Sequence, residues 1–182
     1  MVFSQVLPSL TMKKLWDISP PVDASSPVFP GDTPYTQQWA ATLSETCPVN
    51  VSAITLSPHV GAHADAPLHY DAQGAAVGVL DLSPFLGHCR VIHALAAGPL
   101  VTIAHLQHAL ADVPPRVLVR TCPQFPLTQF DPQLSAFHPD TVQHLADLGV
   151  QLIGIDSASI DPADSKPLPS HQVIRQRGLR VL

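Results

Sequence analysis

The chain has 182 residues, a formal net charge of −5 and only nine Lys and Arg residues. This length suits one domain with a substantial core, and the sparse basic residues exclude a phosphate-backbone or anionic-membrane surface, so we expect neither nucleic acid nor a membrane as a partner. Twenty prolines indicate short elements joined by turns. Cys47, Cys89 and Cys122 show no paired spacing, which favours reduced thiols in a cytoplasmic protein.

The N-terminal part is expected to hold a leader, a strand and a loop. Residues 1–11 are apolar without a basic start, so we interpret them as a leader or alternative start, and 12–182 as one domain. Leu15–Ser19 is predicted to be a strand that ends at a pair of prolines. Val28–Tyr35 is rich in turn residues and carries the aromatic Phe29.

Ligand-type side chains follow a predicted strand at Val51–Ser57. His59, His63, Asp65 and His69 all occupy odd-numbered positions, at spacings of four, two and four. In an extended chain they would project from one side, whereas a helix would separate the first pair from the second. The prolines and glycine within the segment also disfavour a helix.

A metal site in this segment requires a bend. Along a straight strand the backbones of His59 and His63 would lie about 13 Å apart, but two ligands of one ion need donor atoms within roughly 4 Å. Gly61 is the expected hinge, because glycine tolerates positive φ. Imidazole and carboxylate suit Zn²⁺, Mn²⁺ or Fe²⁺ without choosing among them. The alternative is a set of satisfied histidines beside a turn-forming aspartate, which would leave a costly polar stripe.

The rest of the chain is predicted to alternate strands and helices, which indicates an α/β fold. The predicted strands are Arg90–Leu95, Arg116–Thr121, Val150–Asp156 and the segment from Leu179, and the predicted helices follow Thr102 and span 139–148 and 170–176. His105 and His108 are interpreted as a solvated pair, without a carboxylate spaced to complete a metal site. From the residues alone, His171 is interpreted as an N-terminal helix residue.

The segment from His59 to His69 resembles the signature of the metal-dependent cyclase family, specifically its bacterial arylformamidase branch. Ala62 departs from the wider family, which more often has Thr there. The similarity extends to Leu15–Pro21, Phe29–Pro34 and Gly154–Asp161. It is nearly continuous over the predicted domain.

This resemblance implies a swivelling β/β/α fold in a single domain and a homodimer. It also implies two divalent metal ions per chain, most often Zn²⁺ with Mn²⁺ as an alternative. The implied ligands are His59, His63, Asp65 and His171, with Asp65 between the two ions. Asp156 lies near the site in the family, although a strand-ending aspartate that binds local backbone is an equally good interpretation.

The implied activity is hydrolysis of an aryl formamide, N-formyl-L-kynurenine, to L-kynurenine and formate in tryptophan breakdown. His69 is the candidate proton shuttle between water and the leaving aniline nitrogen, and its competing role is that of a further metal ligand. Phe29 stands where the branch usually has a Trp that lines the substrate pocket. Ordinary core packing is the alternative for this ring.

Two other functions stay open at this point. One is hydrolysis of another amide or ester, such as isatin, and the other is a non-catalytic metal-binding protein. The family has a further acidic ligand and closing strands in a region that would follow Leu182, so these are expected to be missing here, and the second metal position would then lack one ligand.

Overall fold

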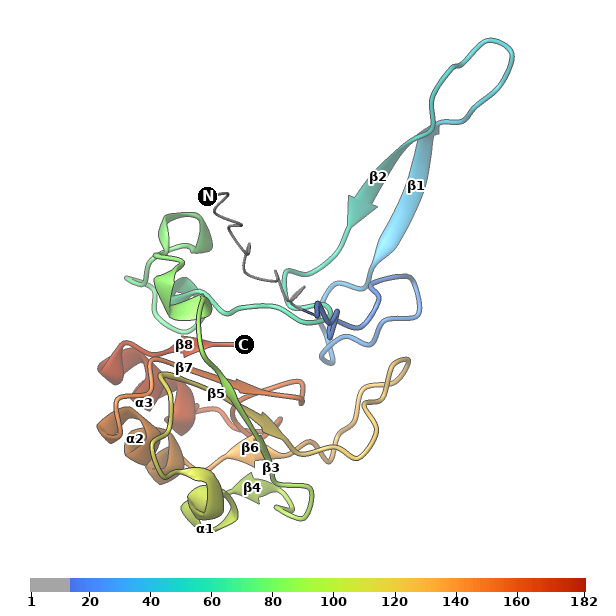
Figure 1. Ribbon diagram of the computed structural model, residues 1–182. Helices are drawn as coiled ribbons and strands as arrows, with labels where there is room; N and C mark the ends of the chain where they lie inside the picture. The colour runs from blue at the N-terminus through green and yellow to red at the C-terminus, as the bar shows by residue number, and fades with distance from the viewer. Residues whose placement is uncertain (1–13) are drawn as a thin grey trace, which may run out of the picture.

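A parallel sheet and two helices form the centre of the computed structural model, which describes residues 14–182. The sheet order is β3-β5-β7-β8, and α2 and α3 pack against it and against each other (Figure 1). These elements span Arg90–His93 (β3), Arg116–Arg120 (β5), Pro139–Asp147 (α2), Leu152–Ile155 (β7), Pro169–Arg177 (α3) and Arg180–Val181 (β8). The α/β class is therefore confirmed, whereas the interpretation of residues 1–11 lies outside the described residues.

The core forms between β-branched strand residues and one stripe of each helix. Val117 and Val119 are buried in β5, and they belong to one cluster with Val142 and Leu145 of α2 and Ile174 of α3. Alternate residues of β5 are buried, as expected when helices cover one face of a strand. Both helices begin with proline, which is suited to a first helical position, and end at a glycine with positive φ.

Short elements complete the body of the molecule. A second parallel pair joins β4 (Leu100–Val101) to β6 (Ala136–Phe137), and α1 (Ile103–Leu106) follows β4 as predicted after Thr102. Single 3₁₀ turns occupy Pro67–His69, Val77–Val79, Ser83–Phe85 and Gln107–Ala109. In the part of the chain that the structure describes, no helix has the length and apolar character needed to cross a membrane.

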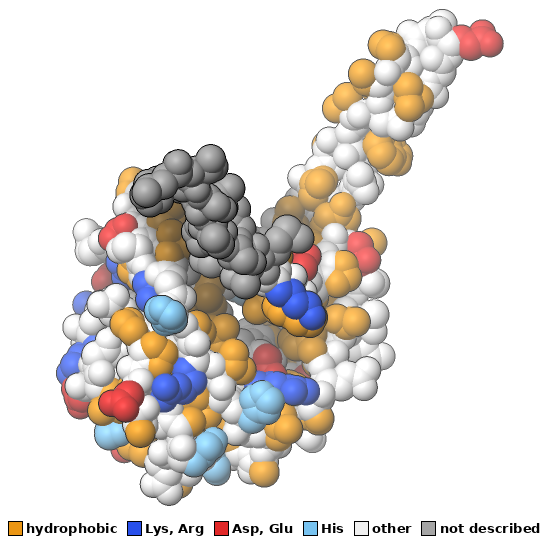
Figure 2. Space-filling model, in the orientation of Figure 1, with side chains coloured by type: hydrophobic (Ala, Val, Ile, Leu, Met, Phe, Trp, Pro, Cys, Tyr) orange, Lys and Arg blue, Asp and Glu red, His pale blue; other side chains and the backbone are white. Residues whose placement is uncertain are grey.

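A two-stranded antiparallel arm projects from this body (Figure 1). It consists of β1 (Thr36–Ala41) and β2 (Val51–Thr55). Large apolar side chains lie open on it, with Trp39 59% and Ile54 53% exposed, and Figure 2 shows apolar side chains along the arm. An exposed apolar hairpin of this kind typically marks a contact surface.

Two strand predictions need correction. Leu15–Ser19 is irregular rather than a strand, with Leu15 94% and Ile18 80% exposed. Within residues 14–182 no strand pairs with this segment, so its backbone lacks the hydrogen-bonded neighbour that a strand requires. The strand predicted at Val51–Ser57 ends at Thr55, and β1 was not predicted.

Candidate metal centre

A bend at Gly61 brings two histidine rings together. Gly61 has φ +71°, and a Cβ atom there would lie 2.6 Å from Cγ2 of Val22, so both the backbone and the space require glycine. The bend starts at Ser57, whose hydroxyl oxygen accepts the His59 N–H at 3.1 Å. The hinge prediction is confirmed, but the ligands lie on a loop followed by a 3₁₀ turn and not on one bent strand.

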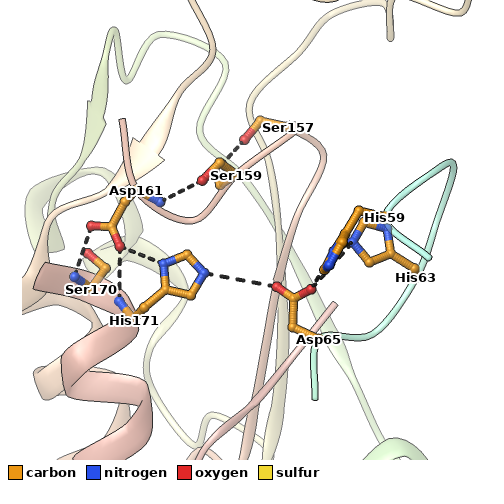
Figure 3. Close-up of polar contacts among 8 residues, drawn as sticks. All are labelled: His59, His63, Asp65, Ser157, Ser159, Asp161, Ser170 and His171. Atoms are coloured by element: carbon orange, nitrogen blue, oxygen red, sulfur yellow. Dashed lines mark hydrogen bonds and ion pairs between the residues drawn. The ribbon is translucent and has the colours of Figure 1, made fainter. Parts of the chain in front are cut away.

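His59, His63 and Asp65 present three donor atoms at the spacing of ligands to one ion. Nδ1 of His59 lies 3.1 Å from Nε2 of His63 and 3.1 Å from Oδ1 of Asp65, and Nε2 of His63 lies 3.5 Å from the same oxygen. Ligands around tetrahedral Zn²⁺ lie about 3.3 Å apart, given metal–ligand bonds of about 2.0–2.1 Å. The predicted convergence of these side chains is therefore observed (Figure 3).

The protonation pattern also fits a metal ligand set. Nδ1 of His63 lies 2.8 Å from the carbonyl oxygen of Gly61, which fixes the proton on Nδ1 and leaves the Nε2 lone pair facing Asp65. Oδ1 of Asp65 is buried and receives no hydrogen bond from any residue within 14–182. A buried carboxylate oxygen without a donor is costly, and a cation removes that cost. The residues present thus fit a divalent metal ion.

Charges in the cluster keep Asp65 ionised. Burial opposes ionisation of Asp65, but His63, His69 and His59 outweigh it and hold its pKa below the ordinary value of 3.8. The nearby Asp65 carboxylate in turn raises the pKa of His63 above 6.5, against the effect of burial. A carboxylate that stays charged among imidazoles is the form in which it can bind a cation.

His171 approaches Asp65 from the opposite side. It lies in the first turn of α3, and its Nε2 is 4.0 Å from Oδ2 of Asp65 (Figure 3). Its Nδ1 lies 2.7 Å from Oδ2 of Asp161, which is fully buried. His171 is therefore both an N-terminal helix residue and a member of the cluster, and the two oxygens of Asp65 face different sets of histidines.

His69 joins the cluster from the 3₁₀ turn Pro67–His69. Its ring centre lies 4.1 Å from that of His59, and His59, Asp65 and His69 form a group whose donor atoms all lie within 4.8 Å of one another. Loss of surrounding water lowers the pKa of His69 below 6.5. Asp65 opposes this shift, and the neighbouring histidines add to it. The ring is thus placed either to bind an ion or to accept a proton.

The loop carrying Phe29 lies beside the cluster. Within that loop Asp32 accepts a hydrogen bond from the Ser57 hydroxyl, which links it directly to the residue that binds the His59 backbone. The ring of Phe29 is half-buried and meets Phe130 edge-on, with ring centres 5.2 Å apart. Its role in substrate binding stays a prediction.

Other polar side chains have structural roles. Asp156 accepts hydrogen bonds from the backbone of Thr121 and Cys122 at the end of the neighbouring strand β5, so it binds backbone as its alternative interpretation proposed, but not the local backbone. His105 caps its own helix through Nδ1, at 3.0 Å from the Thr102 nitrogen. Sequence reasoning missed Asp161, although it closes a segment that carries the family resemblance.

The comparisons with known proteins identify the family of the chain. The Cyclase family model matches residues 16–162, and the chain belongs to that family. Within the family, the chain is 68% identical over 170 residues to the kynurenine formamidase of Delftia acidovorans, a match that covers 93% of this chain and 81% of the relative. The kynurenine formamidase of Paracidovorax citrulli is 65% identical over 176 residues, covering 94% and 82%.

A solved structure of the same fold is more distant in sequence. An isatin hydrolase bound to thioisatinate superposes with a TM-score of 0.74 and 18% identity, over 90% of this chain and 76% of that one. This similarity confirms the cyclase-like fold and carries no information about substrate.

Proposed function

We propose that the chain is an arylformamidase that hydrolyses N-formyl-L-kynurenine to L-kynurenine and formate in tryptophan catabolism. The observation that carries this is the 68% identity to a kynurenine formamidase, in a chain whose His59, His63 and Asp65 donors converge as ligands of one ion. Isatin hydrolysis is the weaker proposal, because the isatin hydrolase is 18% identical. A non-catalytic metal-binding role is the third proposal, in which His69 would be a further ligand of the ion.

A divalent metal held by His59, His63, Asp65 and His171 would acidify a water molecule and polarise the formyl oxygen. We propose Zn²⁺, with two ions per chain, since imidazole and carboxylate suit it and the oxygens of Asp65 face two sets of histidines. Mn²⁺ is the alternative. The chain's own contribution is to keep Asp65 ionised and to bring the donor atoms of these side chains together.

His69 is the proposed proton shuttle. Water adds its oxygen to the formyl carbon, the C–N bond breaks, and the aniline nitrogen must receive a proton as formate leaves. With its pKa lowered by loss of water, the His69 imidazole is neutral at pH 7 and can accept the proton of the attacking water. It can then donate this proton to the nitrogen. Phe29 would contact the aryl ring of the substrate.

The proposed assembly is a homodimer in the cytoplasm. The exposed apolar face of the arm supports the dimer, and the thiols of Cys47, Cys89 and Cys122, all free, support a reducing compartment. We propose residues 12–182 as one metal-dependent hydrolase domain, in line with its single core cluster.

One combined experiment tests the proposed function. Purified protein is analysed for bound metal by mass spectrometry and assayed for formate release from N-formyl-L-kynurenine and for turnover of isatin. The proposal predicts two equivalents of metal per chain, and formate release that chelation abolishes and Zn²⁺ restores. Turnover of isatin alone would support the related hydrolase. Bound metal without turnover of either compound would support the non-catalytic role.

A further inference from the structure

The buried carboxylate of Asp161 is the strongest feature outside the ligand set. It lies in the loop between β7 and α3 and is 0% exposed. Ion pairs to Lys or Arg are absent for it among residues 14–182, where its one charged-group contact is His171. A carboxylate buried so completely needs several hydrogen-bond donors.

Three donors converge on Asp161, and all belong to the start of α3. Oδ1 accepts the backbone N–H of Ser170 at 2.9 Å, and Oδ2 accepts the backbone N–H of His171 at 3.0 Å. Oδ2 also lies 2.7 Å from Nδ1 of His171 (Figure 3). Leu168, at the N-cap position, has a side chain that cannot cap, so Asp161 takes over capping from outside the helix.

The third contact determines the chemistry of the His171 ring. Because a carboxylate can only accept, Nδ1 carries a proton, and in the neutral ring, the form that binds a metal ion, Nε2 keeps its lone pair. That lone pair faces Oδ2 of Asp65 at 4.0 Å. In the other neutral tautomer Nε2 would carry the proton and point an N–H at the ligand cluster. Nε2 could then not bind a cation.

We propose that Asp161 is a positioning residue of the metal centre, which fixes the tautomer and direction of His171 and couples them to the capping of α3. The proposal rests on the proposed metal centre and adds a residue to it. Hydrogen-bonded partners of metal-binding histidines typically change metal affinity about 10–100-fold when removed.

Ser170 offers a matched control. Its hydroxyl donates to the carbonyl oxygen of Phe137 at 2.8 Å and therefore fixes the same helix end without touching the His171 ring. If Asp161 acts only by stabilising the helix, Asp161→Ala and Ser170→Ala should affect metal binding in proportion to their effects on the melting temperature.

The test measures Zn²⁺ affinity by chelator competition on the full chain, together with thermal unfolding. Asp161→Ala is expected to weaken Zn²⁺ binding about 10–100-fold, and Ser170→Ala less than about threefold at a comparable loss of melting temperature. Equal changes in affinity for the two variants, or unchanged affinity in Asp161→Ala, would overturn the proposal.

A second measurement covers the case in which Asp161→Ala does not fold. Nitrogen chemical shifts of His171 in the metal-free wild-type protein should report a protonated Nδ1 and an unprotonated Nε2, and Asp161→Asn should retain folding but bind Zn²⁺ more weakly. A wild-type His171 protonated on Nε2 would overturn the proposal. Failure of the proposed function would appear separately, as wild-type protein that binds Zn²⁺ but releases no formate.

Discussion

His69 is the residue at which two roles can be separated by substitution. Its ring is exposed at the edge of the cluster, so His69→Ala removes the proposed proton shuttle while His59, His63 and Asp65 remain. We expect turnover of N-formyl-L-kynurenine to fall about 10²–10⁴-fold with metal content unchanged. Steady-state kinetics and mass spectrometry measure both. A matching loss of bound metal would assign His69 as a ligand instead.

Phe29 and Phe130 should act together on the aryl group of the substrate. Their rings meet edge-on at 5.2 Å, so each supports the orientation of the other. Phe29→Ala is expected to raise KM about tenfold by loss of apolar contact, and Phe130→Ala by a smaller factor, with little change in kcat. If the double variant raises KM by the product of the two single factors, the two rings act independently.

At the residue scale, nearness in the sequence decides what could be predicted. His59, His63 and Asp65 lie within one short segment, so spacing and one glycine were enough to expect their convergence. Asp161 is ten residues from His171 and meets it only because the loop after β7 folds back on the first turn of α3. Spacing alone carries no signal for such a contact.

Between elements, an ion pair joins the two halves of the site. Arg175 of α3, one turn after His171, donates from Nε to Oδ2 of Asp71 at 2.8 Å, and Asp71 follows His69 by two residues. This pair is partly exposed and screened by solvent, so it contributes little to stability. Its effect should appear in the placement of His69.

Arg175→Gln is therefore expected to reduce kcat severalfold with little change in melting temperature, since small misplacements in a site can cost up to about 10²-fold. Arg177→Gln is the control, because Arg177 forms a similar ion pair with Asp147 of α2, away from the site, at 2.8 Å. Equal activities for the two variants would show that the Arg175 pair does not position His69.

The link between Asp32 and Ser57 should make docking of the Phe29 loop pH-dependent. Hydrogen bonds from the Ser57 hydroxyl and the Thr33 backbone hold the pKa of Asp32 below 3.8, despite partial loss of water. Because the folded-state pKa is the lower one, the stabilisation is present above pH 3.8 and is lost as the pH falls through the folded-state pKa. The melting temperatures of wild type and Asp32→Asn should converge on acidification from pH 5, and a constant difference would contradict this.

At the scale of elements, burial explains which predictions held. The strand at Arg116–Arg120 and the helix α2 each bury an apolar face, so their pattern is visible in the sequence. The buried positions of α3 are Ser170, His171 and Ile174, which form no apolar stripe. β1 is exposed on nearly every residue and therefore carries no alternating pattern. Leu15–Ser19 has the composition of a strand but no neighbour to pair with in the described chain.

For the whole molecule, the alternation of predicted strands and helices indicated an α/β domain but could not supply the order of the strands. The parallel order β3-β5-β7-β8 brings segments far apart in the sequence side by side, and the family resemblance implied a swivelling β/β/α arrangement without this strand order. The arm is the clearest feature that neither core packing nor the metal centre explains, because its apolar side chains contact water in the single chain.

The register of the arm allows a test of its role in dimer formation. Trp39 pairs with Ser52 and Gln37 pairs with Ile54, so Trp39 and Ile54 are neighbours on one face. Gln38 pairs with Ala53 on the other face. In a two-fold symmetric dimer each substitution is present twice. Trp39→Glu with Ile54→Lys should therefore reduce the free energy of dimer formation by about 3 kcal/mol or more, which weakens the dimer affinity at least about 100-fold.

Analytical ultracentrifugation at micromolar concentration is expected to find a dimer for wild type and for Gln38→Glu, and a monomer for the double variant. The control carries a charge on the same arm but on its more polar face, so it separates a general effect of charge from loss of the apolar contact. A monomeric wild type, or a double variant that remains a dimer, would show that this face of the arm does not hold two copies together.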